Sequence, residues 1–471
     1  MTTGFHHSVN VIINRYSWAL LLGALVMLQL SVQLPIFWPL VLLSLCFQLL
    51  LLAKSTELGW GSIGVFFVAL SAIFHLGLLP YLWLGINDSY GFANYHSTWL
   101  SEASSRSASI VVINYISSFA IGYFATSEIA RRQSIKTSRA IPEVLVKVKF
   151  SAPGNSSKVV GLIGVALTLA GSFIIFLNYT LLQGYEVFLT SSDLARGSWG
   201  PFLVLGGIGV GISSKIRSLS ITSFAVGGFA LTLMALSGSR MFLSIAVLIA
   251  ILVSAKSYNL RIQLKWWLLT FLLLIGVSYF RTLRDDSLNW LTTLNPLNGL
   301  YELGGSLRPL VEIIRIKDKD IFEFNFEHVP TLFIWLSNKI YEIFGISETR
   351  YLYGEGVSLL SSRFGEEYRF GYTLITDLYF DFPPIIAFAL FFLVGVLISR
   401  VDSFGCNSIY GGLITTTVSI PLFFSLRQPG SLIVPHTILI GALCAFAVLG
   451  QKLSETMIQG DKRRGEICNQ D

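Results

Sequence analysis

The sequence predicts an all-α polytopic membrane protein with about twelve transmembrane helices, and three observations support this prediction. Hydrophobic residues make up 53% of the 471 residues and charged residues only 13%, about half the charged share of a soluble domain. The mean hydropathy is +0.66. Charges are absent from a series of apolar stretches, most of them near the ~20 residues that a spanning helix needs. Lysine and arginine are also distributed unevenly between the connecting segments.

The apolar stretches divide the chain into four regions. They cover 16–33, 35–53, 60–84, 108–127, 159–183, 200–214, 219–237, 241–255, 266–280, 383–399, 409–426 and 431–450. Residues 1–280 hold the first nine with short connections, 281–382 form one large loop, 383–451 hold the last three, and 452–471 form a tail. We interpret the first stretch as a retained helix rather than a signal peptide, because no long basic region precedes it and no small-residue cleavage site follows it.

The positions of lysine and arginine predict the orientation. With the N-terminus in the cytoplasm, the inner segments hold 19 of these residues and the short outer loops only four. Cytoplasmic loops carry such an excess in membrane proteins. We therefore expect both termini in the cytoplasm and the 281–382 loop outside.

Several functions are disfavoured. No Asp, Glu, Lys or Arg lies inside any predicted span, whereas ion-coupled transporters usually carry carboxylates or broken helices there. His75 and His436 are the ionisable exceptions, expected mainly as hydrogen-bonded packing residues, with His436 near the outer end of its helix. The sequence has no CxxC or HExxH metal pattern, and the large loop is net acidic, so we expect no metal, no cofactor and no nucleic acid.

Two other patterns predict packing and membrane contact. Gly207 and Gly211 form a GxxxG pair, which lets two helices approach closely. Residues 329–345 have apolar positions near helical spacing, which predicts an amphipathic helix that lies on the membrane or roofs a cavity. Residues 128–158 are basic, and we expect them to form a cytoplasmic loop.

Arginines at the outer ends of the spans are candidates for binding an anionic headgroup. Arg196, Arg240, Arg281 and Arg427 all lie close to the predicted outer interface. Arginine keeps its charge and presents a planar fork that matches phosphate oxygens. The alternative is that these side chains simply reach lipid phosphates. Arg240 is the strongest candidate, because it lies in a minimal hairpin beside Gly238.

A second candidate segment precedes the tenth span. It contains Arg363, Glu366, Glu367, Tyr368 and Arg369 within seven residues. A carboxylate beside arginine suits a general base when its pKa is tuned to the task. A surface ion-pair network is the alternative interpretation.

The layout resembles a known family. Many spans, a large outer loop before the last few spans, GSR between two mid-chain spans, and SSRFGEEYRFG followed by an apolar helix resemble Wzy-type O-antigen polymerases, the oligosaccharide repeat-unit polymerases of bacterial inner membranes. Arg196 and Gly207 also match an R-x10-G spacing of some members, although the large loop has no second copy.

The resemblance implies a reaction and its partners. A glycan linked to undecaprenyl pyrophosphate would be the donor, a second lipid-linked repeat unit the acceptor, and a chain-length-regulating co-polymerase a partner. It implies that Arg196, Arg240, Arg281 and Arg427 hold pyrophosphate, that Arg363 and Arg369 orient sugar or the second diphosphate, and that Tyr368 stacks on sugar. Glu366 or Glu367 would be the base, with His436 as an alternative, and Arg240 would also act in catalysis.

Two alternative functions remain open at this stage. An O-antigen ligase uses the same donor but attaches finished chains to lipid A–core. A flippase would move the lipid-linked oligosaccharide without making a bond, and the uncharged spans argue against it.

Overall fold

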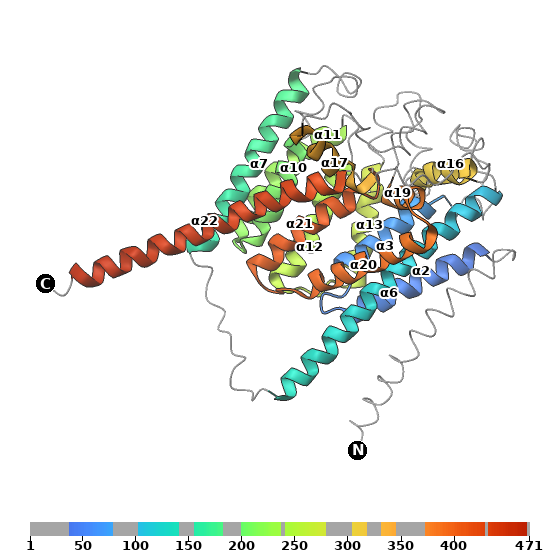
Figure 1. Ribbon diagram of the computed structural model, residues 1–471. Coiled ribbons are helices and arrows are strands. Elements are labelled where there is room, and N and C mark those ends of the chain that lie inside the picture. Colours follow the sequence, from blue (N-terminus) through green and yellow to red (C-terminus); the bar gives the residue numbers. More distant parts are fainter. Residues whose placement is uncertain are drawn as a thin grey trace.

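The computed structural model shows a helical bundle (Figure 1). It describes residues 37–78, 102–140, 155–181, 199–236, 241–278, 304–317, 331–344, 373–428 and 432–468. These residues form fourteen α-helices and two short 3-10 turns. Within them, β-pairing is limited to one isolated bridge between Gly59 and Ile262.

Eleven of these helices coincide with the second to twelfth apolar stretches. They are α2 (Phe37–Ser55), α3 (Ile63–Leu76), α6 (Glu102–Ala140), α7 (Asn155–Leu181), α10 (Trp199–Ser213), α11 (Arg217–Leu236), α12 (Met241–Tyr258), α13 (Leu264–Ser278), α20 (Pro384–Ser403), α21 (Ile409–Phe424) and α22 (Ile433–Cys468). The first stretch, 16–33, lies outside the described residues.

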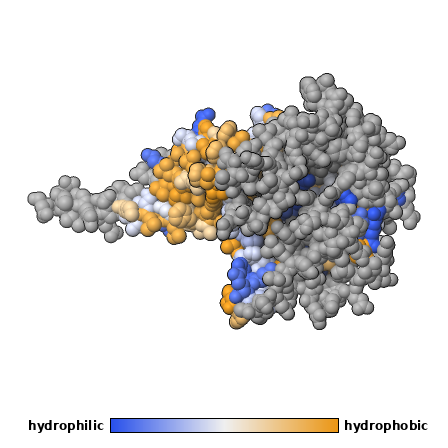
Figure 2. Space-filling model, turned by 90° about the horizontal axis from the view of Figure 1, so that it is seen from above, coloured by the Kyte–Doolittle hydropathy of each residue, from blue (hydrophilic) through white to orange (hydrophobic). Residues whose placement is uncertain are grey.

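Within the described part of the chain, six helices are long and apolar enough to cross a membrane. The candidate spans are Ser105–Ser127, Ser156–Leu177, Arg217–Ala235, Met241–Tyr258, Pro384–Ser403 and Ile433–Met457, and α2, α3, α10 and α21 contain shorter apolar helices. Large apolar side chains are exposed on α7, α11 and α22, including Phe173, Phe229 and Leu449. Figure 2 shows a broad hydrophobic surface beside the projecting end of α22. Such a surface suits a multi-pass membrane protein.

Glycines let some helices pack closely, as the GxxxG pattern predicts. A Cβ on Gly164 of α7 would come within 2.4 Å of the Gly211 backbone nitrogen in α10. A Cβ on Gly207 would meet Thr168 of α7 at the same distance. The prediction that Gly207 and Gly211 serve helix packing is therefore confirmed.

Part of the large loop is helical. It contains η4 (Gly304–Ser306), α16 (Leu307–Lys317), η5 (Thr331–Phe333), α17 (Ile334–Ile343) and α19 (Leu374–Asp381). The helix expected within 329–345 is confirmed as α17. The expectation of a loop at 128–158 is wrong at both of its ends, because α6 continues to Ala140 and α7 begins at Asn155.

Four short connections meet at one end of the bundle, which we call the basic end: 56–62, 214–216, 259–263 and 404–408. The Lys215 ammonium donates to the carbonyl of Asn407 at 2.5 Å and to its side-chain oxygen at 2.7 Å. The Asn407 amide donates to the Lys256 carbonyl at 2.9 Å, and the Ile262 amide to the Leu58 carbonyl at 3.2 Å. Burial lowers the pKa of Lys215.

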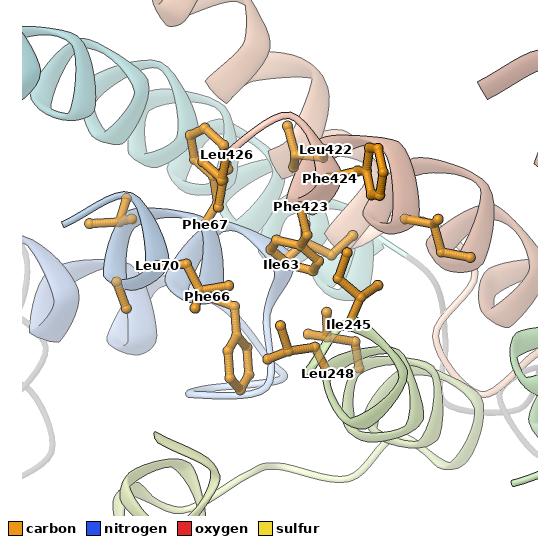
Figure 3. Close-up of a cluster of buried hydrophobic side chains, with 14 of the residues drawn as sticks. Ile63, Phe66, Phe67, Leu70, Ile245, Leu248, Leu422, Phe423, Phe424 and Leu426 are labelled. Carbon is orange, nitrogen blue, oxygen red and sulfur yellow. The ribbon is translucent and has the colours of Figure 1, made fainter. Parts of the chain in front are cut away.

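The opposite end, which we call the loop end, holds the helices of the 281–382 segment. There α16 packs against α6, α3 and α19, while α17 packs against α22. Figure 1 shows α16, α17 and α19 away from the projecting C-terminal ends of α6 and α22. Between the two ends, buried apolar side chains of α3, α12 and α21 form a core that includes Phe66, Leu248 and Phe423 (Figure 3).

Candidate functional site

Most of the predicted site residues lie outside the described part of the chain. These are Arg196, Arg240, Arg281, Arg363, Glu366, Glu367, Tyr368 and Arg369. Arg427 and His436 are described, and both lie at the loop end. The described part of the candidate site consists of the helix ends that flank the predicted residues.

Arg427 lies in the turn that follows α21. Its backbone amide donates to the Phe424 carbonyl at 3.2 Å. Its guanidinium lies over the ring of Phe74 in α3, 5.5 Å from the ring centroid. A cation over a ring face is attracted by the ring quadrupole, so this contact joins the end of α21 to the end of α3.

His436 lies in the first turn of α22, between aromatic rings. Its imidazole stacks on Phe202 of α10 with the centroids 3.9 Å apart, and it lies perpendicular to the ring of Phe424 with the centroids 4.9 Å apart. Its Nδ1 atom is buried and has no hydrogen-bond partner among the described residues. A neutral imidazole with a free nitrogen can accept a hydrogen bond or a proton from a bound group.

The rings around His436 bring four helix ends together. Phe202 lies near the start of α10, Phe242 near the start of α12 and Phe424 at the end of α21. Their centroids are 5.0 to 5.6 Å apart. We call Phe202, Phe242, Phe424 and His436 the aromatic cluster.

The aromatic cluster is close in sequence to three predicted arginines. Arg196 precedes Phe202 by six residues, Arg240 precedes Phe242 by two, and Arg427 follows Phe424 by three. The described helix ends next to these arginines in the sequence, the starts of α10 and α12 and the end of α21, therefore converge on one place at the loop end.

The start of α19 is anchored beside this place. Thr373, the N-cap residue of α19, places its hydroxyl oxygen 3.0 Å from Nε2 of the buried His75 in α3. The Leu374 amide donates to the carbonyl of Ser425, just after α21, at 3.0 Å. The packing role expected for His75 is confirmed, because its other nitrogen bonds to the Ser71 carbonyl at 2.8 Å. The segment that contains Arg363 to Arg369 thus leads directly into an anchored helix.

Buried carboxylates of the loop helices form a feature that the sequence analysis missed. Asp381 accepts hydrogen bonds from the Thr331 amide at 2.6 Å and from the Thr331 hydroxyl at 3.2 Å, which ties α19 to η5. Asp377 is also buried, and Glu312 of α16 pairs with Arg315 at 3.4 Å. Asp377 follows Thr373 by one helical turn, a spacing that places both residues on one face of α19.

A second missed feature lies at the basic end. The carboxylate of Asp402 accepts from the Tyr123 hydroxyl at 2.6 Å and from the amides of Ile63 and Gly64, the first residues of α3, at 3.1 and 3.2 Å. Lys256 is buried beside it and donates to the carbonyls of Val401 and Asp402. The sequence signal was a carboxylate only three residues beyond a predicted span. Lys256 lies in the last turn of α12, and its side chain is buried.

Comparisons with known proteins give no match for this chain. No protein-family model, no curated protein and no solved structure matches it.

Proposed function

We propose that the protein is a membrane glycosyltransferase, a polymerase that joins undecaprenyl-pyrophosphate-linked oligosaccharide repeat units into O-antigen-like polysaccharide. It needs neither a metal nor a cofactor, because the lipid pyrophosphate is already an activated leaving group. The growing chain and the next repeat unit are donor and acceptor, and a chain-length-regulating co-polymerase assists.

The topology that goes with this proposal has twelve spanning helices. Both termini face the cytoplasm, and the loop end faces the periplasm. The imbalance of 19 to four lysines and arginines supports this orientation. The grouping of connections 56–62, 214–216, 259–263 and 404–408 at the basic end agrees with it, because the charge pattern assigns all four to the same side.

The single observation that carries the proposal is the convergence of helix ends at the aromatic cluster. Phe202, Phe242 and Phe424 are mutually in contact. The helix ends that carry them adjoin Arg196, Arg240 and Arg427 in the sequence. Arginines next to such a place in the sequence suit a diphosphate at the membrane surface, since each guanidinium can offer two parallel hydrogen bonds.

The reaction assigns a role to each group. The acceptor hydroxyl oxygen attacks the anomeric carbon of the donor sugar, the bond from that carbon to the pyrophosphate oxygen breaks, and lipid pyrophosphate leaves. Arg196, Arg240, Arg281 and Arg427 hold the pyrophosphate and stabilise the negative charge that grows on it. Glu366 or Glu367 takes the hydroxyl proton, and His436 is the alternative base. Arg363, Arg369 and Tyr368 orient the sugar.

The test is the glycan ladder of a strain that lacks the gene. Lipid A–core that carries only single repeat units supports a polymerase. Unmodified core with polymer accumulated on its lipid carrier indicates a ligase instead, and repeat units accumulated on the cytoplasmic side indicate a flippase. Either of the last two results overturns the proposal.

A substitution of Arg240 tests the site. Arg240→Lys keeps the charge but loses the fork, which removes a hydrogen bond to a charged group worth about 1.5–3 kcal/mol. Transfer then slows by roughly 10- to 150-fold, so complementation yields mostly single units and short chains. Arg217→Lys at the basic end is the matched control and should restore the full ladder. A full ladder from well-expressed Arg240→Ala removes Arg240 from the site.

A further inference from the structure

Helix α17 exposes a continuous apolar stripe. Leu336, Ile340 and Ile343 recur with the spacing of one helix face, and their side chains are 46%, 45% and 79% exposed. Phe333 before the helix and Phe344 after it extend the same face and are also exposed. We call these five residues the α17 stripe.

The other side of α17 is held by the protein. Ile334 and Thr331 are buried. Thr331 is bound through its amide and hydroxyl to the carboxylate of Asp381, which is itself buried in α19. These bonds fix the rotation of the η5–α17 segment, so the outward direction of the stripe is set by the fold.

Charged groups lie beside the stripe rather than within it. Lys339 and Glu342 form an exposed ion pair at 2.5 Å. Lysine next to an apolar face, with its long stem along that face and its ammonium in water, is typical of helices at a membrane surface. A stripe of five large apolar side chains in water would be an aggregation hazard on a soluble protein.

The α17 stripe adjoins the surface that faces lipid. Both η5 and α17 pack against α22. The exposed side chains of α22 are apolar from Ile438 through Phe446 to Leu449, and this helix is one of the six candidate spans. The apolar surface of a spanning helix thus leads at the loop end to the apolar stripe of α17.

The geometry points to α17 as an interfacial helix that lies in the membrane surface at the loop end, with its stripe among the acyl chains. Its partner is the bilayer itself. The helix thereby fixes the large loop against the membrane through the Thr331–Asp381 bonds, whatever reaction the protein performs. This inference does not depend on the proposed function.

Spin labels test the inference in the full-length protein. The four cysteines are replaced by serine, and single cysteines at 336, 340 and 343 are labelled in vesicles of phosphatidylethanolamine and phosphatidylglycerol. The ratio of oxygen to nickel-chelate accessibility should be several-fold higher at these positions than at the exposed Glu342, which lies outside the stripe. It should match that of a label at the lipid-facing Leu449. High nickel accessibility at the stripe, or low accessibility to both reagents, overturns the inference.

A second measurement uses the unmodified protein and avoids any effect of substitution on folding. The protein is reconstituted with a phospholipid that carries a photoreactive diazirine in its acyl chain. After illumination, lipid adducts should be found by mass spectrometry in the peptide that contains 333–344 and in α22. Adducts in α22 without adducts in 333–344 contradict the inference.

Discussion

Two tyrosines of α6 offer a controlled test of the buried cluster at the basic end. Tyr123 and Tyr115 are both buried and lie about two helical turns apart. The hydroxyl of Tyr123 donates to Asp402 at 2.6 Å. The hydroxyl of Tyr115 has no hydrogen-bond partner among the described residues. Substitution by phenylalanine should therefore lower the free energy of unfolding at Tyr123 but not at Tyr115.

The hydrogen bonds set the expected sizes. Tyr123→Phe removes a bond to a charged acceptor, which should lower the free energy of unfolding by about 1.5–3 kcal/mol. Tyr115→Phe removes a buried hydroxyl that has no partner among the described residues. The free energy of unfolding should therefore stay unchanged or rise, with an upper limit of about 1–3 kcal/mol. The ring is retained in both variants, and packing therefore changes little.

Equilibrium unfolding in mixed detergent and SDS micelles measures both effects. Tyr123→Phe should lower the free energy of unfolding by about 1 kcal/mol or more less in a protein that already carries Asp402→Asn than in the unmodified protein. This difference is expected because contacting residues are coupled. Equal losses from Tyr115→Phe and Tyr123→Phe would refute the assignment. So would strict additivity of the Tyr123 and Asp402 substitutions.

Three further predictions concern the loop end. Glu366→Gln and Glu367→Gln test which carboxylate is the base. The variant that loses the base should give single repeat units in the glycan ladder at unchanged protein level. Normal ladders from both variants and from the double variant exclude both carboxylates. A cysteine at Lys339 should react with a membrane-impermeant thiol reagent in intact spheroplasts and a cysteine at Ser403 only after lysis, and the reverse result inverts the topology. His75→Leu should lower the free energy of unfolding by about 1 kcal/mol in the SDS titration, because it removes the hydrogen bond to the start of α19; unchanged stability would show that this bond contributes nothing.

Hydropathy alone was sufficient to predict the bundle helices. The expected stretches 219–237 and 241–255 correspond to α11 (Arg217–Leu236) and α12 (Met241–Tyr258). Such agreement arises because each spanning helix must satisfy its own backbone groups within an apolar run, so the signal is local. The amphipathic helix α17 was predicted from another local signal, the helical spacing of its apolar residues.

Helix α16 shows where a local signal was present but unused. Leu307, Leu310, Val311 and Ile314 have the spacing of one helix face, and all four are buried against the bundle. The charged residues between and around these positions lower the mean hydropathy of the segment, so a hydropathy search does not detect the helix. A search for helical periodicity within the large loop would have found this helix.

The hydrogen-bonded clusters could not be predicted in the same way. Asp402 meets Tyr123 across 279 positions of sequence, and His75 meets Thr373 across 298. Neither residue type nor spacing specifies such partners, which depend on how the helices pack. The same reason explains why the meeting of Phe202, Phe242 and Phe424 emerged only from the structure, although the arginines beside them were identified from the sequence.

The two ends of the bundle are held by different forces, and this difference bears on where a reaction can occur. At the basic end, buried charged side chains such as Lys256 and Asp402 bond directly to backbone groups of other helices. Opening these contacts would leave charges and amides unpaired at a cost of about 1–3 kcal/mol for each group, so this end is fixed.

At the aromatic cluster the helix ends meet through ring contacts, which have no obligatory partner and lose little when one ring shifts against another. On the proposed function this end admits a lipid-linked glycan and releases lipid pyrophosphate, and contacts that can shift suit that role. The buried Nδ1 of His436, which has no hydrogen-bond partner among the described residues, lies within them, at the end where we propose the reaction.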